Sequence, residues 1–95
     1  MLTIDEIRNV VVNISNLYQI KKVSLFGSYA NGTATEDSDV DMLIEFKSPG
    51  ISLFTLTNIK FDIMDKLNKE VDIIHGPLNP DSMIIIEKVI DIYEQ

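Results

Sequence analysis

The sequence predicts an α/β (α+β) fold, a small mixed β-sheet covered by helices, in the order α-β-α-β-α-β-α. Segments with apolar residues at helical spacing alternate with short apolar runs that Gly or Pro terminates. A long helical segment separates the second and third runs, and such a crossover makes two strands parallel. The short connection between the first two runs suits an antiparallel pair. A length of 95 residues corresponds to a single domain, residues 1–95.

Capping residues predict where the helices begin. Thr3 and Glu6 have the spacing of a capping box at the start of the first helix. Ser52 is the expected N-cap of the long middle helix, and Asn79 with Pro80 predicts the start of the last one. In chain order, the predicted elements are a helix over 2–18, a strand over 23–26, a polar loop with one helical turn over 28–37, a strand over 38–46, a helix over 51–68, a strand over 70–76 and a helix over 79–95.

The predicted last helix is apolar over more than one stripe. A helix that is apolar around so much of its circumference usually buries a second face. Two interpretations stay open: a wide contact with the core of a small domain, or a surface for a partner or a second copy, which would make a homo-oligomer through the C-terminal helix. The apolar residues concerned are Met83, Ile84, Ile85, Ile86, Val89, Ile90, Ile92 and Tyr93.

Composition and charge exclude several classes of function. Fifteen Asp and Glu against eight Lys and Arg give a net charge of -7, which disfavours duplex nucleic acid as a partner. The absence of cysteine excludes disulfides and thiolate metal sites and fits a cytoplasmic protein. The first residues have no signal-peptide pattern, and no apolar run approaches the ~18 residues of a membrane span, so no membrane association is expected.

Three aspartates interrupt apolar strands, where carboxylates repel one another and lose hydration. Asp39 and Asp41 point to the same side of the second predicted strand, because side chains alternate along a strand. Asp72 interrupts the third strand in the same way. Carboxylate oxygens are ligands that Mg²⁺ prefers, and two such ions can stabilise the attacking and leaving oxygens of a phosphoryl transfer. The alternative is a set of acids that face solvent at strand ends.

The pair Gly27-Ser28 ends the first predicted strand, and the chain must turn sharply there. Glycine lets the backbone approach an anion closely, and the N–H groups of the turn with the Ser28 hydroxyl can hold phosphate. The loop then returns Asp39 to the side of Gly27, so that a triphosphate on the loop would place its metal ions on the acids. Ser38 is expected either to orient the turn before Asp39 or to contact the nucleotide. A plain strand-ending turn is the alternative for the glycine pair.

The spacing of these residues resembles a known signature. Gly27-Ser28, ten residues and then the DVD of residues 39–41 are similar to the GSx10DxD motif of the nucleotidyltransferase superfamily related to DNA polymerase β. The small size, and "SDVDMLIEF" followed later by "EVDII", resemble its minimal nucleotidyltransferase (MNT) branch. The resemblance extends over essentially the whole chain and implies the nucleotidyltransferase fold.

The resemblance implies a role for each matching residue. Gly27 and Ser28 would hold the terminal phosphates of the nucleotide. Asp39 and Asp41 would bind two Mg²⁺ ions. Asp72 would bind the catalytic ion and help the acceptor hydroxyl to lose its proton. The three aspartates would thus be both catalytic and metal-binding.

The resemblance also implies a partner. Members of the MNT branch are commonly paired with a helical HEPN-domain protein as a toxin–antitoxin module. In such pairs the MNT protein is the antitoxin, and some MNT members transfer AMP from ATP to a tyrosine of the HEPN toxin. A nucleoside triphosphate, most simply ATP, is therefore the expected substrate. The alternative is a non-catalytic antitoxin that neutralises a helical partner by binding it. A small-molecule enzyme of the aminoglycoside-modifying type is disfavoured, since those relatives usually carry additional helical domains.

The chain departs from the commonest pattern of the family at two positions. Asn31 stands where many relatives have an arginine, and Thr35 stands where an arginine or lysine is usual. A missing cation near the phosphates would weaken binding or leave the task to Lys21, Lys22 or metal ions.

Overall fold

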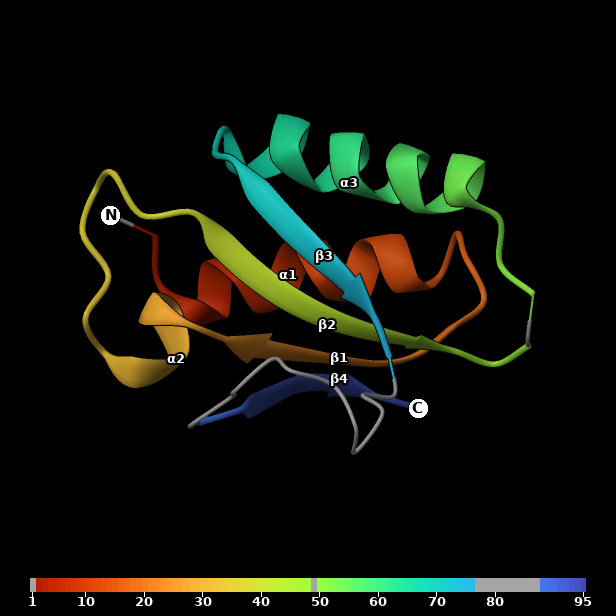
Figure 1. Cartoon of the computed structure of the whole chain (residues 1–95), viewed down its shortest axis with the longest axis horizontal. Helices are drawn as coiled ribbons and strands as arrows, with labels where there is room; N and C mark the ends of the chain where they lie inside the picture. Colours follow the sequence, from red (N-terminus) through yellow and green to blue (C-terminus); the bar gives the residue numbers. More distant parts are fainter. Residues whose placement is uncertain (1, 49, 77–87) are drawn as a thin grey trace.

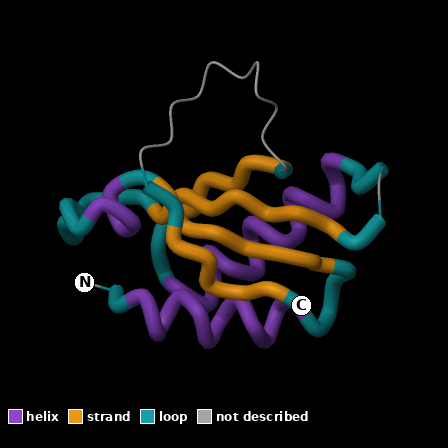
Figure 2. Tube along the Cα trace, turned by 90° about the horizontal axis from the view of Figure 1, so that it is seen from below, coloured by secondary structure: helices purple, strands orange, loops and turns teal. Residues whose placement is uncertain are grey.

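The computed structural model describes residues 2–48, 50–76 and 88–95, and these residues form one mixed sheet with two long helices against one face (Figures 1 and 2). The strand order is β3-β2-β1-β4. As predicted, β2 is antiparallel to β1 and parallel to β3. A fourth strand, β4, which was not predicted, is antiparallel to β1. The elements are α1 (Ile4–Ser15), β1 (Ile20–Phe26), α2 (Ser28–Asn31), β2 (Val40–Phe46), α3 (Leu53–Leu67), β3 (Val71–His75) and β4 (Ile90–Glu94).

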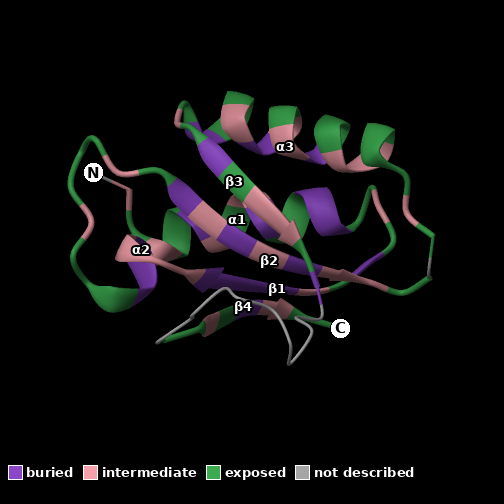
Figure 3. Cartoon of the chain, viewed as in Figure 1, coloured by how far each residue is buried: buried purple, intermediate pink, exposed green. Residues whose placement is uncertain are grey.

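The core lies between the sheet and the helices α1 and α3. Along β2 the side chains of Val40, Met42 and Ile44 are fully buried, whereas the alternate residues are partly exposed (Figure 3). This alternation confirms the predicted faces of the strand and places Asp41 on the face that the helices do not cover. The helices contribute Ile7, Val11, Ile14, Ile59, Ile63 and Leu67 to the same core.

Two of the predicted helix starts are confirmed. The Thr3 hydroxyl oxygen accepts a hydrogen bond from the Glu6 N–H at 3.1 Å, and the Ser52 hydroxyl oxygen accepts one from the Thr55 N–H at 3.2 Å. Each bond satisfies an N–H group that a helix leaves without an internal partner. The first strand begins at Ile20, three residues earlier than predicted, because the buried Ile20 still pairs with β2.

The predicted helix over 79–95 is wrong in its described part, where residues 90–94 form the strand β4. The run Ile90-Asp91-Ile92 alternates apolar and acidic residues, and β-branched residues favour strands. Ile92 is buried in the core, and β4 pairs with the edge of β1 that β2 leaves open. Pairing along that edge satisfies backbone groups that a helix here would leave exposed on β1.

Residues 88–95 give no support to the predicted homo-oligomer through a C-terminal helix, because they are not helical. Ile90 and Tyr93 pack against the core, together with the buried Ile92. The predicted cap at Asn79 and Pro80, and the apolar residues 83–86, lie outside the described residues. No helix in the described ranges has both the length and the apolar character needed to cross a membrane.

Candidate active site

The sheet brings two of the three predicted aspartates together. Asp41 and Asp72 are direct neighbours in the register of the parallel pair β2–β3, and Asp41 is also the neighbour of Phe26, the last residue of β1. Strand β1 ends, and β2 and β3 begin, at the same end of the sheet (Figure 1). Asp39 lies at this end too, exposed, one residue before β2 begins.

The electrostatics of this end are unfavourable for Asp41. Partial burial raises its pKa, the negative charges of Asp72 and Asp39 raise it further, and so does a hydrogen bond shared with Asp72. Each cause opposes the ionised form, because burial removes hydration and neighbouring carboxylates repel it. Asp41 therefore lies in a position where a positive charge would be stabilising.

Gly27 lies directly against the Asp41 carboxylate. Its backbone has φ 73° and ψ −150°, a region that residues with a side chain rarely adopt. A Cβ atom on Gly27 would collide with the Asp41 carboxylate, whose Cγ would be 3.2 Å away. The predicted approach of the Gly27 turn to the acidic residues is thus present at Asp41, and only glycine fits there.

The turn after Gly27 is anchored by α2. Ser28 begins this short helix, and the next two residues, Tyr29 and Ala30, are buried in the core. The Asn31 N–H donates to the Gly27 carbonyl oxygen at 2.9 Å. The packing of α2 thereby fixes the backbone of Gly27 and Ser28 beside the acidic end of the sheet.

Ser38 closes the turn that precedes Asp39. Its hydroxyl oxygen accepts a hydrogen bond from the Thr35 N–H at 2.8 Å, and its own N–H donates to the Thr35 carbonyl oxygen at 3.1 Å. These bonds match the turn-orienting role that the sequence predicts for Ser38. A contact between Ser38 and a nucleotide stays a prediction.

Lys69 is a residue that the sequence analysis missed. Its ammonium group donates a hydrogen bond to the Glu36 carbonyl oxygen, and so attaches the turn before β3 to the loop that carries Ser38 and Asp39. Nearby, the Val40 N–H donates to the Glu70 carbonyl oxygen at 3.0 Å. The lysine, 33 residues after Glu36 in the chain, thus holds the loop against the start of β3, where Asp72 lies.

Replacement of Lys69 by Met is expected to free this loop. The amide hydrogens of residues 36–39 should exchange faster, and the affinity of the acidic end for a divalent cation should fall by roughly tenfold, as with other groups that orient metal ligands. Hydrogen exchange and calorimetric titration with Mn²⁺ would measure the two effects. Lys66→Met, three residues away on the exposed side of α3, is the matched control. Equal exchange rates in the two variants would contradict the role of Lys69.

Lys22 does not take the place of the missing arginine in this arrangement. It lies on β1 four residues before Phe26, and its ammonium group is 3.5 Å from the Asp91 carboxylate and 3.9 Å from that of Glu94. A hydrogen bond from the Ser24 hydroxyl at 2.7 Å, followed by the charge of Lys22, lowers the pKa of Asp91. Lys22 is therefore engaged with β4, on the side of β1 away from β2.

The donor set at the acidic end suits a hard cation. It consists of carboxylate oxygens, which Mg²⁺ prefers, and the charge repulsion around Asp41 is what such an ion would relieve. Among the described residues, no three Asp, Glu, His or Cys side chains stand in an arrangement that could hold a metal ion as they are. Asp39 is exposed and precedes β2, and its negative charge acts on Asp41 together with that of Asp72.

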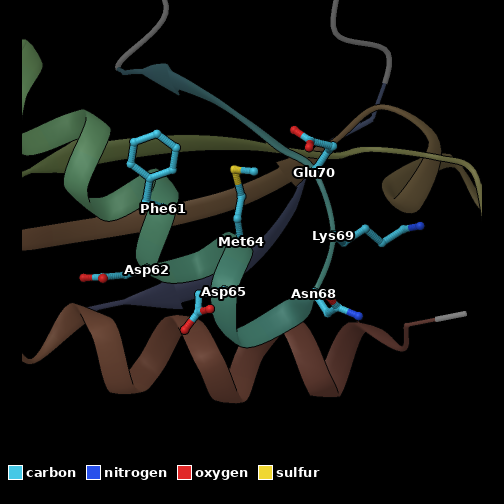
Figure 4. Close-up of a pocket in the computed structure, with 7 residues that line it drawn as sticks. All are labelled: Phe61, Asp62, Met64, Asp65, Asn68, Lys69 and Glu70. Atoms are coloured by element: carbon cyan, nitrogen blue, oxygen red, sulfur yellow. The ribbon is translucent and has the colours of Figure 1, made fainter.

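A hollow among the described residues lies elsewhere on the surface. It has a volume of about 760 Å³ and runs over the second half of α3 and the turn that follows (Figure 4). Its lining residues are Phe61, Asp62, Met64, Asp65, Asn68, Lys69 and Glu70. None of the three predicted aspartates lines it, although Glu70, which does, comes two residues before Asp72 in the chain.

Comparisons with known proteins identify relatives of this chain and structures that share its fold. A protein of Methanocaldococcus jannaschii, provisionally named a protein adenylyltransferase, is 38% identical over 73 residues, which are 77% of each chain. A solved structure provisionally described as a minimal nucleotidyltransferase is 30% identical over 78% of each chain, with a TM-score of 0.65. The MNT antitoxin complex with a tri-AMPylated HEPN toxin of Shewanella oneidensis contains a chain with a TM-score of 0.67 at 14% identity, covering 98% of this chain and 74% of that one, which shows a shared fold.

The family comparison covers almost the whole chain. Residues 8–94 match the family described as polymerase beta, nucleotidyltransferase. The match includes all the elements from within α1 to the last residue of β4. The predicted fold and family are thereby confirmed, and the chain belongs to the polymerase beta nucleotidyltransferase family.

Proposed function

We propose that this nucleotidyltransferase moves AMP from ATP to a tyrosine hydroxyl of a HEPN-type toxin, with Mg²⁺, and thereby acts as an antitoxin. The observation that carries the proposal is the register of Asp41 beside Asp72, with Gly27 against the Asp41 carboxylate. The name protein adenylyltransferase of the relative supports the choice of AMP. The complex of an MNT antitoxin with an AMPylated HEPN toxin supports the choice of partner.

The residues divide the chemistry between them. Gly27 and Ser28 would bind the β- and γ-phosphates through backbone N–H groups and the Ser28 hydroxyl. Asp39, Asp41 and Asp72 would hold two Mg²⁺ ions, which supply neutralisation of charge on the phosphates and a lowered pKa of the acceptor hydroxyl. Ser38 would keep Asp39 in place through its turn.

The transfer itself is a substitution at the α-phosphorus. The acceptor oxygen forms a bond to this phosphorus, the bond from the phosphorus to the oxygen of the β-phosphate breaks, and pyrophosphate leaves. Asp72 would accept the hydroxyl proton as the new bond forms. The protein takes little part in covalent steps of this reaction, so it contributes mainly by positioning the reactants and neutralising charge.

Intact-mass spectrometry tests the proposal directly. The chain is incubated with ATP, Mg²⁺ and the HEPN-domain protein encoded beside it, and Asp39→Asn serves as the variant. We expect the partner to gain AMP units with the wild-type chain and to gain none with the variant or without Mg²⁺. Transfer at the wild-type rate by Asp39→Asn would contradict the assignment of the site.

A second candidate function is that of a binding antitoxin whose nucleotide site is weakened. The observation in its favour is Asn31, exposed at the end of α2 where many relatives place an arginine. In that case neutralisation of the toxin should survive the loss of the aspartates. Cells that express the toxin together with the Asp39→Asn or Asp41→Asn variant of this chain would distinguish the two functions. They should grow if the chain neutralises the toxin by binding, and they should not grow if it acts as an enzyme, since only the enzyme depends on the carboxylates.

A further inference from the structure

The open face of the sheet, which α1 and α3 do not cover, becomes apolar directly beyond the acidic end (Figure 2). Side chains alternate along a strand, so Leu43 follows Asp41 on this face of β2, and Ile74 follows Asp72 on this face of β3. The parallel register makes Leu43 and Ile74 direct neighbours, as it does the two aspartates. We call Leu43 and Ile74 the apolar pair. It adjoins the two carboxylates of the candidate active site.

The fold does not use the apolar pair in its core. Leu43 and Ile74 are both partly exposed. Among the described residues, the partly buried apolar side chains that pack against the core include Ile73, on the other face of β3, but neither member of the pair. Apolar side chains that lie beside a few polar groups, and that the core does not need, are typical of a binding site.

Polar groups and backbone limit the apolar pair to the size of a single ring. At its far end lies Gly76, where a Cβ atom would be 3.1 Å from Leu43 Cδ1 and 3.0 Å from Glu45 Cγ. Toward β1 the neighbour of Leu43 is Ser24, whose hydroxyl donates a hydrogen bond to the Asp91 carboxylate at 2.7 Å. With the two aspartates at the near end, the pair is bordered on three sides. It therefore suits one side chain and not a helix or a strand.

The order of the strands indicates which substrate meets the apolar pair. The proposed phosphate site, Gly27 with Ser28, directly follows β1. Asp72, which receives the acceptor proton in the proposed reaction, lies on β3, two strands away and at the edge of the sheet. The apolar pair belongs to β2 and β3, so it lies on the acceptor side of the acidic end and not on the side of the phosphates.

The dimensions of a sheet favour a phenol as the occupant. Residues on one face of a strand follow each other at about 6.6 Å, and adjacent strands are about 4.8 Å apart. A tyrosine with its hydroxyl oxygen at Asp72 can lay its ring over Ile74 and Leu43, because that oxygen stands at the far end of the ring. The hydroxyl oxygen of serine or threonine is bonded to Cβ, so these side chains reach Asp72 without covering the apolar pair.

We propose that Leu43 and Ile74 form an acceptor subsite, which binds the ring of the acceptor tyrosine and makes the chain select a phenol over an aliphatic hydroxyl. This inference rests on the proposed function for the reaction, and it deepens that function by assigning the residues that choose the acceptor. The apolar pair takes no part in the covalent step, in which the hydroxyl proton goes to Asp72 and pyrophosphate leaves. It contributes by removing the ring from water.

Binding of p-cresol, which is the tyrosine side chain without its backbone, tests the subsite without any reaction. In a chain labelled at its Leu and Ile methyl groups, p-cresol should shift the NMR signals of Leu43 and Ile74 far more than those of Leu53. Leu53 is the matched control, because it is 80% exposed and lies on α3, on the other face of the sheet. Equal shifts at Leu53 would show unspecific contact with exposed apolar groups and would overturn the proposal. Shifts with adenosine and none with p-cresol would assign the pair to the nucleotide base and would overturn it too.

A polar version of the pair tests its part in the reaction with the HEPN-domain protein encoded beside the chain. Leu43→Asn combined with Ile74→Thr keeps the size of both side chains. The double variant should raise the KM for the partner by roughly tenfold and leave kcat and the affinity for ATP nearly unchanged, as expected when a pocket loses apolar contacts. Val12→Thr, at a 38% exposed position of α1, is the control and should keep the wild-type KM. A fall in kcat with an unchanged KM would overturn the proposal. If the double variant does not fold, Ile74→Thr alone gives the same comparison, because both residues are β-branched.

Selection between hydroxyl groups is measured on the partner. The tyrosine that gains AMP, located by mass spectrometry, is replaced by serine, and the wild-type chain should then transfer at a rate lower by tenfold or more, roughly the discrimination of an apolar pocket. Equal rates would overturn the proposal. If the wild type transfers no AMP and yet p-cresol shifts the signals of Leu43 and Ile74, the aromatic subsite stands while the transferase function fails. If AMP is transferred and the double variant keeps the wild-type KM, the function stands and the subsite fails.

Discussion

Asp41→Asn is expected to abolish AMP transfer, by roughly 10³-fold, while it stabilises the metal-free protein. The amide keeps the shape of the side chain but removes a carboxylate that would bind metal. In the metal-free protein that carboxylate is penalised by burial and by Asp72 and Asp39. The gain in the free energy of unfolding at neutral pH should be about 0.5 to 1 kcal/mol, kept small because part of the site is hydrated.

The stability difference between Asp41→Asn and the wild type should depend on pH. Because the folded state raises the pKa of Asp41, this residue does not penalise folding below the ordinary pKa of an aspartate, and the penalty develops as pH rises through the raised value. Urea unfolding with a chelator present would measure the difference, which should be largest at neutral pH and close to zero in acid.

Glu45→Gln is the matched control for Asp41→Asn. It removes the same charge from the same face of β2, four residues further from the acidic end. Transfer should stay near the wild-type rate in this variant. A loss of transfer as large as that of Asp41→Asn would mean that net charge, and not the position of Asp41, governs activity.

Gly27→Ala is expected to have the largest effect on stability and to lower transfer as well. An alanine would carry the strain of a φ of 73° with ψ −150°, and its methyl group would displace the Asp41 carboxylate. The expected loss of unfolding free energy is about 2 to 3 kcal/mol. Transfer per folded molecule should fall because both the phosphate turn and one metal ligand move.

A second glycine separates strain from collision. Gly32 has φ 76° and ψ 17°, and a Cβ there would meet nothing within 4 Å. Gly32→Ala should therefore lower the free energy of unfolding by only about 1 kcal/mol, because the alanine must adopt a left-handed backbone. Its transfer activity should be unchanged. Urea unfolding and a transfer assay on both variants make the comparison. Equal losses of transfer in the two variants would contradict the contact between Gly27 and Asp41 as the cause.

The parts of the fold that local chemistry determines were predictable from the sequence. Thr3 and Ser52 cap their helices because their own hydroxyl groups reach N–H groups three residues away. The two faces of β2 follow from the alternation of acids with buried Val40, Met42 and Ile44. The proximity of Asp41 and Asp72 follows from a parallel crossover, with both residues at the start of their strands.

The parts that depend on distant contacts were not predictable. Val89, Ile90, Ile92 and Tyr93 fit a helical spacing as well as a strand, and the open edge of β1 decides between them. Lys69 looks like an ordinary turn lysine until its bond to the Glu36 carbonyl brings together residues 33 positions apart. The exposure of Phe54 and Phe61 likewise depends on how α3 packs against the sheet, which the sequence does not show.

The place of β4 in the sheet has a consequence for synthesis on the ribosome. Strand β1 pairs on one side with β2, which follows it closely, and on the other with β4, which is made about 65 residues later. Until residues 90–94 emerge, the nascent chain presents the outer edge of β1 without its neighbour, and such an edge can pair with other chains. Chaperones that cover growing polypeptides would therefore matter most for this protein until residues 90–94 have emerged.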